Sequence, residues 1–159
     1  EDAPAVWDAV IQAGKEFDLQ PIGLAARDTL RLEKGYCLYG NDIDDSTSPI
    51  AAGLGWVTKF TKEFINWEEI KDHKENGTDQ KLIGFKLIGK GIPRKDYNIL
   101  DENGTTIGRV TSGTMSPLLN EAIGLGYVNK EYAQEGQPVY IEIRNKQIEA
   151  QIQKPPFVN

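Results

Sequence analysis

The side chains that could do chemistry gather in one stretch, residues 23–44, which reads GLAARDTLRLEKGYCLYGNDID. Its first part is rich in Ala, Leu and Arg, which are good helix formers, and Gly35 is a natural helix stop. The chain then carries aromatic and apolar residues interrupted by Gly40 and Asn41, which predicts an extended segment entering a turn. Charged and aromatic groups therefore meet where the backbone changes direction. Because loops held by rigid elements commonly carry function, we interpret this stretch as the wall of a binding site.

Arg27 is the first candidate for that site. The two alanines that precede it are small, so a ligand or a neighbouring backbone could approach it closely. The residues alone leave an alternative open, in which Arg27 forms a structural ion pair with Asp28, Glu33 or Asp42.

Arg31 and Tyr39 are the other notable residues of the stretch. We expect Arg31 to brace the helix against Asp42 or Asp44. Tyr39 could pack against a flat ring of a ligand, but a buried tyrosine with a satisfied hydroxyl is an equally good interpretation.

Nucleophilic and metal chemistry find little support in the sequence. The single cysteine, Cys37, has no histidine nearby to activate it, so we interpret it as a small buried hydrophobe. The single histidine, His73, lies among charged residues and is predicted to be an exposed surface residue. One histidine and one cysteine are too few for a typical zinc site, so no metal is expected.

Two later segments carry polar side chains without a catalytic pattern. The segment VTSGTMSP, residues 110–117, has no accompanying histidine, so a hydrolase triad is unsupported. We interpret Ser116-Pro117 as a turn that faces the neighbouring domain. Arg94 and Arg144 are possible ligand contacts, with surface charge as the favoured interpretation.

Helices and one strand are predicted in the first half of the chain. Residues 4–17 place Trp7, Val10, Ile11 and Phe17 on one face of a helix, which predicts core packing. Residues 56–60 alternate apolar and polar side chains as a half-buried strand does. Asn66 is the expected N-cap of a helix that ends at Gly77.

From residue 81 onward the sequence changes to short strand-like runs separated by glycines and turn residues. Residues 139–144 and 148–153 alternate cleanly on either side of a short turn, which predicts a hairpin. Several short strands at this spacing predict an antiparallel barrel or sandwich. We therefore expect an α+β part followed by an all-β antiparallel barrel or jelly-roll-like domain, with the boundary near residues 75–80.

The stretch at 23–44 closely resembles the signature of the T protein of the glycine cleavage system, the tetrahydrofolate-dependent aminomethyltransferase. Downstream segments resemble that family in the same order: SPIAAGLGWVTKF, KLIGFKLIGKGIPRKDYNI, GTTIGRVTSGTMSPLLNEAIGLGYV and KPPFV. Iron–sulfur-assembly relatives carry a KGCYxGQE-type motif where this chain has KGYCLYGNDID, which favours the aminomethyltransferase branch. The resemblance implies the C-terminal part of a folate-binding core at residues 1–78 and a C-terminal barrel at residues 79–159.

The resemblance also implies an activity. An aminomethyl group on the lipoyl arm of a carrier (H) protein is passed to tetrahydrofolate, ammonia leaves, and methylenetetrahydrofolate forms. The arginine of the AARD motif, here Arg27, lines the substrate and folate pocket in that family. The family's catalytic aspartate and its GYTGE motif lie upstream and are absent here, so no catalytic residue is expected in this chain, and the fragment alone is expected to be inactive. Two alternatives stay open, a non-catalytic module that binds folate or the carrier protein, and the folate-binding part of a sarcosine or dimethylglycine demethylating enzyme.

Composition narrows the class of protein. The net charge of −6 gives no electrostatic support for binding nucleic acid. No apolar run is long enough to span a membrane, and no signal-peptide pattern opens the chain. A single cysteine fits a reducing compartment, so we expect a bacterial cytoplasmic protein, or a mitochondrial matrix protein if the source is eukaryotic. The opening EDAPAVWDAV, without an initiator Met, indicates a C-terminal fragment of a larger protein.

Overall fold

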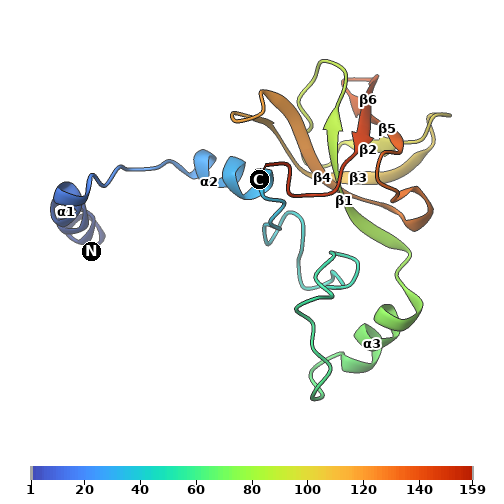
Figure 1. The fold of residues 1–159 in the computed structure, drawn as a ribbon, viewed down its shortest axis with the longest axis horizontal. Coiled ribbons are helices and arrows are strands. Elements are labelled where there is room, and N and C mark those ends of the chain that lie inside the picture. The colour runs from blue at the N-terminus through green and yellow to red at the C-terminus, as the bar shows by residue number, and fades with distance from the viewer. Residues whose placement is uncertain (1, 159) are drawn as a thin grey trace.

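A computed structural model describes residues 2–158. Its second half is a closed antiparallel β-barrel with the strand order β1-β4-β3-β2-β5-β6 (Figure 1). The strands are β1 (Gln80–Leu87), β2 (Asn98–Leu100), β3 (Thr106–Ser116), β4 (Glu121–Asn129), β5 (Pro138–Ile143) and β6 (Lys146–Ile152). The prediction of an antiparallel barrel is confirmed, and of the two forms considered the chain adopts the closed barrel rather than a jelly roll.

Alternating apolar residues fill the inside of the barrel. Phe85, Ile99, Val128, Val139 and Ile141 are all fully buried, and they belong to one core cluster. The predicted hairpin is formed by β5 and β6, which pair from Pro138↔Gln151 to Ile143↔Lys146. Its two turn residues, Arg144 and Asn145, have φ of 49° and 63°, the left-handed conformation that matches the twist of a tight hairpin.

Helix α2 (Leu24–Glu33) packs against the outside of the barrel. Leu32 is fully buried there with Ile123, Leu125 and Phe157, so a second apolar cluster joins the helix, the barrel and the end of the chain. This cluster connects α2 to the barrel and to the last described residues, where the Phe157 N–H donates to the carbonyl of Glu33 at the end of the helix.

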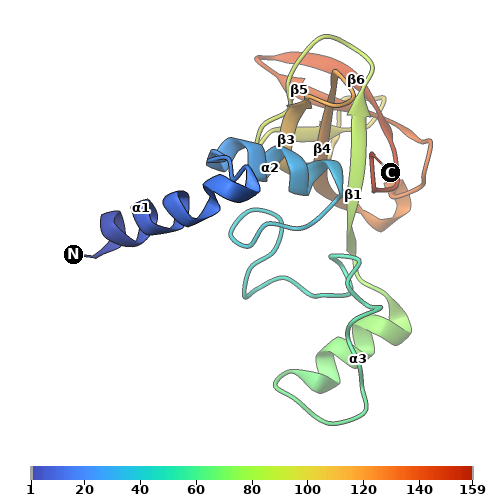
Figure 2. The same ribbon diagram turned by 60° about the vertical axis from the view of Figure 1, so that its left-hand side comes forward.

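Helix α1 (Ala3–Gly14), followed by the short helix η1 (Lys15–Phe17), lies apart from the barrel in both views (Figures 1 and 2). The predicted helix exists, but none of its residues is buried. Trp7 is 58% exposed and Phe17 78% exposed, so the predicted core packing of this face is wrong for residues 2–158. The physical reason is that the linker at 18–23 separates the helix from the barrel, so this face does not reach the barrel core.

Helix α3 (Trp67–Asn76) lies on another side of the barrel, and Gly77 with φ of 86° ends it as predicted. The predicted strand at 56–60 is wrong, because these residues form turns and irregular backbone without a partner strand. His73 is half-buried rather than exposed, with its Nδ1 3.0 Å from Ser48 Oγ. No helix within residues 2–158 has the length and apolar character that crossing a membrane requires.

Candidate functional site

The end of α2 directs the chain into the segment at 36–45. The Gly35 N–H donates to Leu32 O (2.8 Å) and the Tyr36 N–H donates to Arg31 O (2.8 Å). These two bonds form a Schellman motif, which requires the left-handed backbone that Gly35 adopts at φ of 72°. The helix stop predicted at Gly35 is confirmed, and it sets the direction in which the aromatic segment leaves the helix.

A buried ion pair fixes this segment to the helix. Arg31 Nη1 donates to Asp42 Oδ2, and the two side chains are 9% and 0% exposed. The Asp42 carboxylate also accepts from the Leu38 N–H at 2.9 Å and from Thr111 Oγ1 at 2.5 Å. Both carboxylate oxygens of Asp42 therefore accept hydrogen bonds, as a buried carboxylate requires.

The same ion pair reaches the barrel. Arg31 Nη2 donates to Ser112 Oγ at 2.8 Å, and the hydroxyl of Tyr127 donates to the Asp42 backbone carbonyl at 2.9 Å. Arg31 also donates to Asp28 Oδ1 through Nε and Nη2. The prediction that Arg31 braces the helix against Asp42 is confirmed. Burial is the main cause that raises the pKa of Tyr127 well above its usual range.

Asp44, the other predicted partner of Arg31, lies in the polar turn instead. Its carboxylate accepts from Ser46 and Thr47, and these hydrogen bonds hold its pKa below the usual range.

A second contact joins α2 to the end of β3. Ser116 is fully buried and its hydroxyl donates to Glu33 Oε1 at 2.5 Å, while the Phe157 N–H donates to Glu33 O at 2.8 Å. Ser116 therefore faces the preceding helical part of the chain, as predicted, and it serves as a structural contact between the two parts.

A groove of about 660 Å³ lies between the segment after α2, the loop before α3, strand β1 and the end of the chain. Two exposed aromatic side chains line it, Tyr36 (66% exposed) and Trp56 (74% exposed). Lys34 and Lys154 also belong to its lining, and the Lys34 ammonium donates to the Val158 carbonyl at 3.1 Å. The remaining lining residues are Gly35, Cys37, Ile43, Ala52, Gly53, Leu54, Leu82, Ile83, Gly84, Leu125, Pro155 and Pro156.

This composition can bind a flat ring that carries a negative group. Aromatic faces stack on planar ligands, and the two lysines supply cations for a carboxylate. Gly84 is required at the floor, because a Cβ there would lie 2.6 Å from Gln153 O and 2.9 Å from Pro155 Cγ. The groove is therefore formed partly by the close approach of the C-terminal tail to β1.

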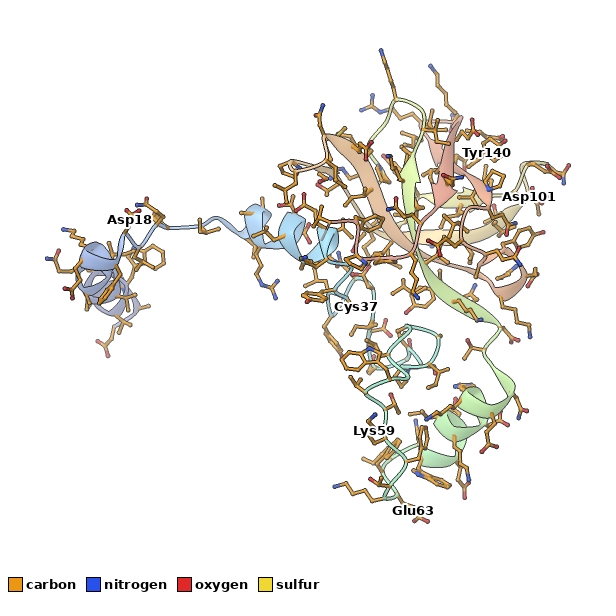
Figure 3. The ribbon with its side chains drawn as sticks, in the orientation of Figure 1. Asp18, Cys37, Lys59, Glu63, Asp101 and Tyr140 are labelled. Atoms are coloured by element: carbon orange, nitrogen blue, oxygen red, sulfur yellow. The ribbon has the colours of Figure 1, made fainter. Side chains whose placement is uncertain are left out.

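Cys37 lines the groove but is not an activated nucleophile. It is half-buried, and burial, followed by the charge of Asp42, raises the pKa of its thiol. Figure 3 shows Cys37 where the segment after α2 passes the barrel. This agrees with the interpretation of Cys37 as a small apolar residue. Residues 2–158 contain no group of three or more His, Cys, Asp or Glu side chains placed to hold a metal ion.

Arg27 is exposed on α2 and has no ion pair or hydrogen bond through its side chain within residues 2–158. The structural ion pair considered for Arg27 is therefore absent. Its three possible partners are engaged elsewhere, because Asp28 and Asp42 bind Arg31 while Glu33 accepts from Ser116. The guanidinium of Arg27 is available to a ligand.

Tyr39 is 69% exposed, so the interpretation of it as a buried tyrosine is wrong. Neither Arg27 nor Tyr39 lines the groove, whereas Tyr36 and Trp56 do. The sequence could have indicated Tyr36 as a groove residue, since it directly follows the helix stop and its direction is set by the Schellman motif. Trp56 had no comparable local signal, because the alternation around it suggested a strand.

The fold and the site define a class of protein: a closed antiparallel barrel joined by a buried ion pair to a helix and loop that carry a ligand groove. Residues 80–159 match the family model of the glycine cleavage T-protein C-terminal barrel domain, and residues 1–62 match that of the GCVT N-terminal domain. The chain belongs to the glycine cleavage T-protein family.

Several relatives show the extent of this similarity. An aminomethyltransferase of Bacteroides thetaiotaomicron is 55% identical over 157 residues, which are 98% of this chain and 44% of the relative. One of Halothermothrix orenii is 54% identical over 159 residues, again 44% of the relative. The crystal structure of the glycine cleavage system aminomethyltransferase T from Bartonella henselae superposes with a TM-score of 0.87 at 34% identity, covering 98% of this chain and 44% of that one. The chain thus spans less than half the length of these relatives.

Proposed function

We propose that the polypeptide containing this chain is a tetrahydrofolate-dependent aminomethyltransferase of the glycine cleavage system. It would transfer a methylene group from the aminomethyl-loaded lipoyl arm of the carrier (H) protein to tetrahydrofolate, with release of ammonia. The observation that carries this proposal is the 55% identity to an aminomethyltransferase along 98% of the chain. The bacterial relatives support a cytoplasmic location.

Within this reaction the chain supplies binding and orientation. Tetrahydrofolate carries the reactive nitrogen and the protein positions it against the methylene group. Arg27 is proposed to pair with an anionic group of the substrate or folate, because its guanidinium has no internal partner and such groups bind carboxylates through two parallel hydrogen bonds. Tyr39 is proposed as a more peripheral contact. The stacking surfaces of Tyr36 and Trp56 in the groove extend this proposed site.

The 159-residue chain alone is expected to show no turnover with reduced folate, loaded carrier protein and an ammonia assay. In the full-length polypeptide, Arg27→Ala should weaken folate or substrate use by about tenfold or more, since a charge-assisted pair contributes roughly 1.5–3 kcal/mol. Arg109→Ala, at an exposed arginine of β3, is the matched control. Turnover by the chain alone would contradict its expected inactivity, and unchanged kinetics in a folded Arg27→Ala variant would contradict the proposed role of Arg27.

A second function, a docking module, has a specific observation in its favour. The main core cluster is built only from residues between Ile83 and Ile152, so the barrel has a core of its own. We infer a unit at residues 79–159, with residues 1–78 as the C-terminal part of the folate-binding core. Residues 79–159 expressed alone should then fold and bind the carrier protein without folate; failure to bind in a folded barrel would remove the docking role.

The remaining alternative, a sarcosine or dimethylglycine demethylating enzyme, requires a flavin domain upstream. Relatives that share 54–55% identity with the chain, among them those from two Bacteroides species and Flavobacterium psychrophilum, are aminomethyltransferases, which favours the first proposal. Sequencing the native polypeptide upstream of this chain distinguishes the two.

A further inference from the structure

Four cationic side chains line one pocket at the end of the barrel that carries the β5–β6 turn. The pocket has a volume of about 440 Å³ and contains Lys90, Arg94, Arg144 and Lys146. No Asp or Glu belongs to its lining, although the chain as a whole has a net charge of −6. The other lining residues are Gly91, Ile92, Tyr97, Ile143 and Ile148.

These cations are not neutralised by the protein. None of the four forms an ion pair within residues 2–158, where the paired cations are Arg31, Lys71 and Lys86. The one side-chain hydrogen bond among them runs from Arg94 Nη1 to the Gly113 carbonyl at 3.3 Å, which orients Arg94 without cancelling its charge. All four side chains are exposed, so their charges face the solvent around one pocket.

The pocket is a built feature with two fixed walls. One wall is the segment after β1, which approaches the hairpin closely because it contains glycines: a Cβ on Gly91 would lie 2.8 Å from Ile143 Cδ1, and one on Gly89 2.9 Å from Ile148 Cγ2. The other wall is the β5–β6 turn, whose left-handed residues hold Arg144 at its tip. The partly buried Tyr97, Ile143 and Ile148 pack on the barrel core and form the floor.

We propose that this pocket binds a small multivalent oxyanion, bearing phosphate or carboxylate groups. A cleft lined by one sign of charge focuses the field and concentrates counter-ions. The two guanidinium groups provide planar donor pairs that match phosphate and carboxylate oxygens, and the two ammonium groups provide point charges. A bound anion would supply the ion-pair partner that these four cations lack within residues 2–158. The site shares no lining residue with the groove beside Tyr36, and it does not depend on the proposed function.

The test is isothermal titration calorimetry of the 159-residue chain at low ionic strength, with inorganic pyrophosphate in one arm and citrate in the other. The pocket variant is Arg144→Gln combined with Lys146→Gln. The control is Lys62→Gln combined with Lys130→Gln, which removes the same charge from exposed lysines outside the pocket. Circular dichroism and thermal unfolding check that each variant is folded. Lys90→Gln is a second pocket variant that leaves the turn unchanged.

We expect binding of one anion per chain, weakened about tenfold or more by the pocket variant and little by the control. Amide NMR shifts on titration should be confined to residues 90–97 and 143–148. Tighter binding of pyrophosphate assigns the site to phosphate groups, and tighter binding of citrate assigns it to carboxylates. Equal weakening by both double variants would show a net-charge effect and overturn the site, as would the absence of binding by both probes.

Discussion

Replacement of Asp42 tests the buried ion pair that joins α2, the segment at 36–45 and the barrel. Asp42→Ala removes a carboxylate with no exposed surface and leaves the Arg31 guanidinium, 9% exposed, with the half-exposed Asp28 as its remaining ion-pair partner. It also leaves the Leu38 N–H and the Thr111 hydroxyl without the acceptor that they have at 2.9 and 2.5 Å. The change therefore removes the buried ion pair of Arg31 and leaves two hydrogen-bond donors without their acceptor.

The size of the effect follows from this geometry. Removing one partner of a buried ion pair is most costly when the other charge stays unpaired, and here Arg31 keeps Asp28, so we expect a cost of about 2–4 kcal/mol. For a chain of this size that corresponds to a fall in Tm of roughly 4–16 °C. Asp42→Asn should cost only about 1–2 kcal/mol, since the amide keeps an acceptor for Arg31 and can donate to the Thr111 hydroxyl.

The assay is urea unfolding followed by circular dichroism, with Arg31→Met added to complete a double-mutant cycle. We expect Arg31→Met to recover part of the stability lost in Asp42→Ala, with a coupling energy of about 1–3 kcal/mol. Asp45→Ala, at an exposed carboxylate of the following turn, is the control and should change stability by less than about 0.5 kcal/mol. Equal, small effects of Asp42→Ala and Asp45→Ala, with no coupling to Arg31, would refute the reasoning.

Three further predictions concern groups around the same site. The pKa of Tyr127 is higher in the folded chain than in the unfolded chain, so the unfolded chain loses this proton first and the free energy of unfolding should fall as the pH rises above about 10. Tyr127→Phe should reduce that fall, measured by urea titrations at pH 8 and 10.5. An unchanged pH dependence in Tyr127→Phe would contradict this prediction. The raised pKa of Cys37 should make its thiol react more slowly with a thiol reagent at pH 8 in the folded chain than in urea, measured by absorbance; equal rates would show that burial does not protect it. Gly84→Ala should destabilise the chain by about 1–3 kcal/mol and release the C-terminal tail to proteolysis, because the new Cβ would collide with Gln153 O. Gly23→Ala is the control, since nothing lies within 4 Å of a Cβ at that position. An intact tail in Gly84→Ala would show that the tail adapts.

The sequence by itself determined the elements that depend on local pattern. The strand-like runs predicted from residue 81 onward form the six strands of the barrel, and the β5–β6 hairpin forms where the alternating residues at 139–144 and 148–153 predicted it. Helix α2 ends at Gly35 and α3 ends at Gly77, because a glycine can take the left-handed backbone that ends a helix at no steric cost. These features are set within a few residues of one another, so neighbouring side chains suffice to specify them.

Only the tertiary structure decided which charged side chains are engaged within the fold. Arg27 and Arg31 lie one helical turn apart, yet Arg31 faces the barrel and pairs with Asp42 and Ser112, whereas Arg27 is exposed and has no side-chain partner among residues 2–158. Ser112 is 81 residues away in the sequence, and no local pattern reports such a contact. The exposure of α1 and the placement of Tyr36 rather than Tyr39 in the groove likewise depend on how segments distant in the sequence are arranged. An amphipathic pattern shows that a face can be buried, but burial also requires a surface to pack against, and the folded chain alone determines where one exists.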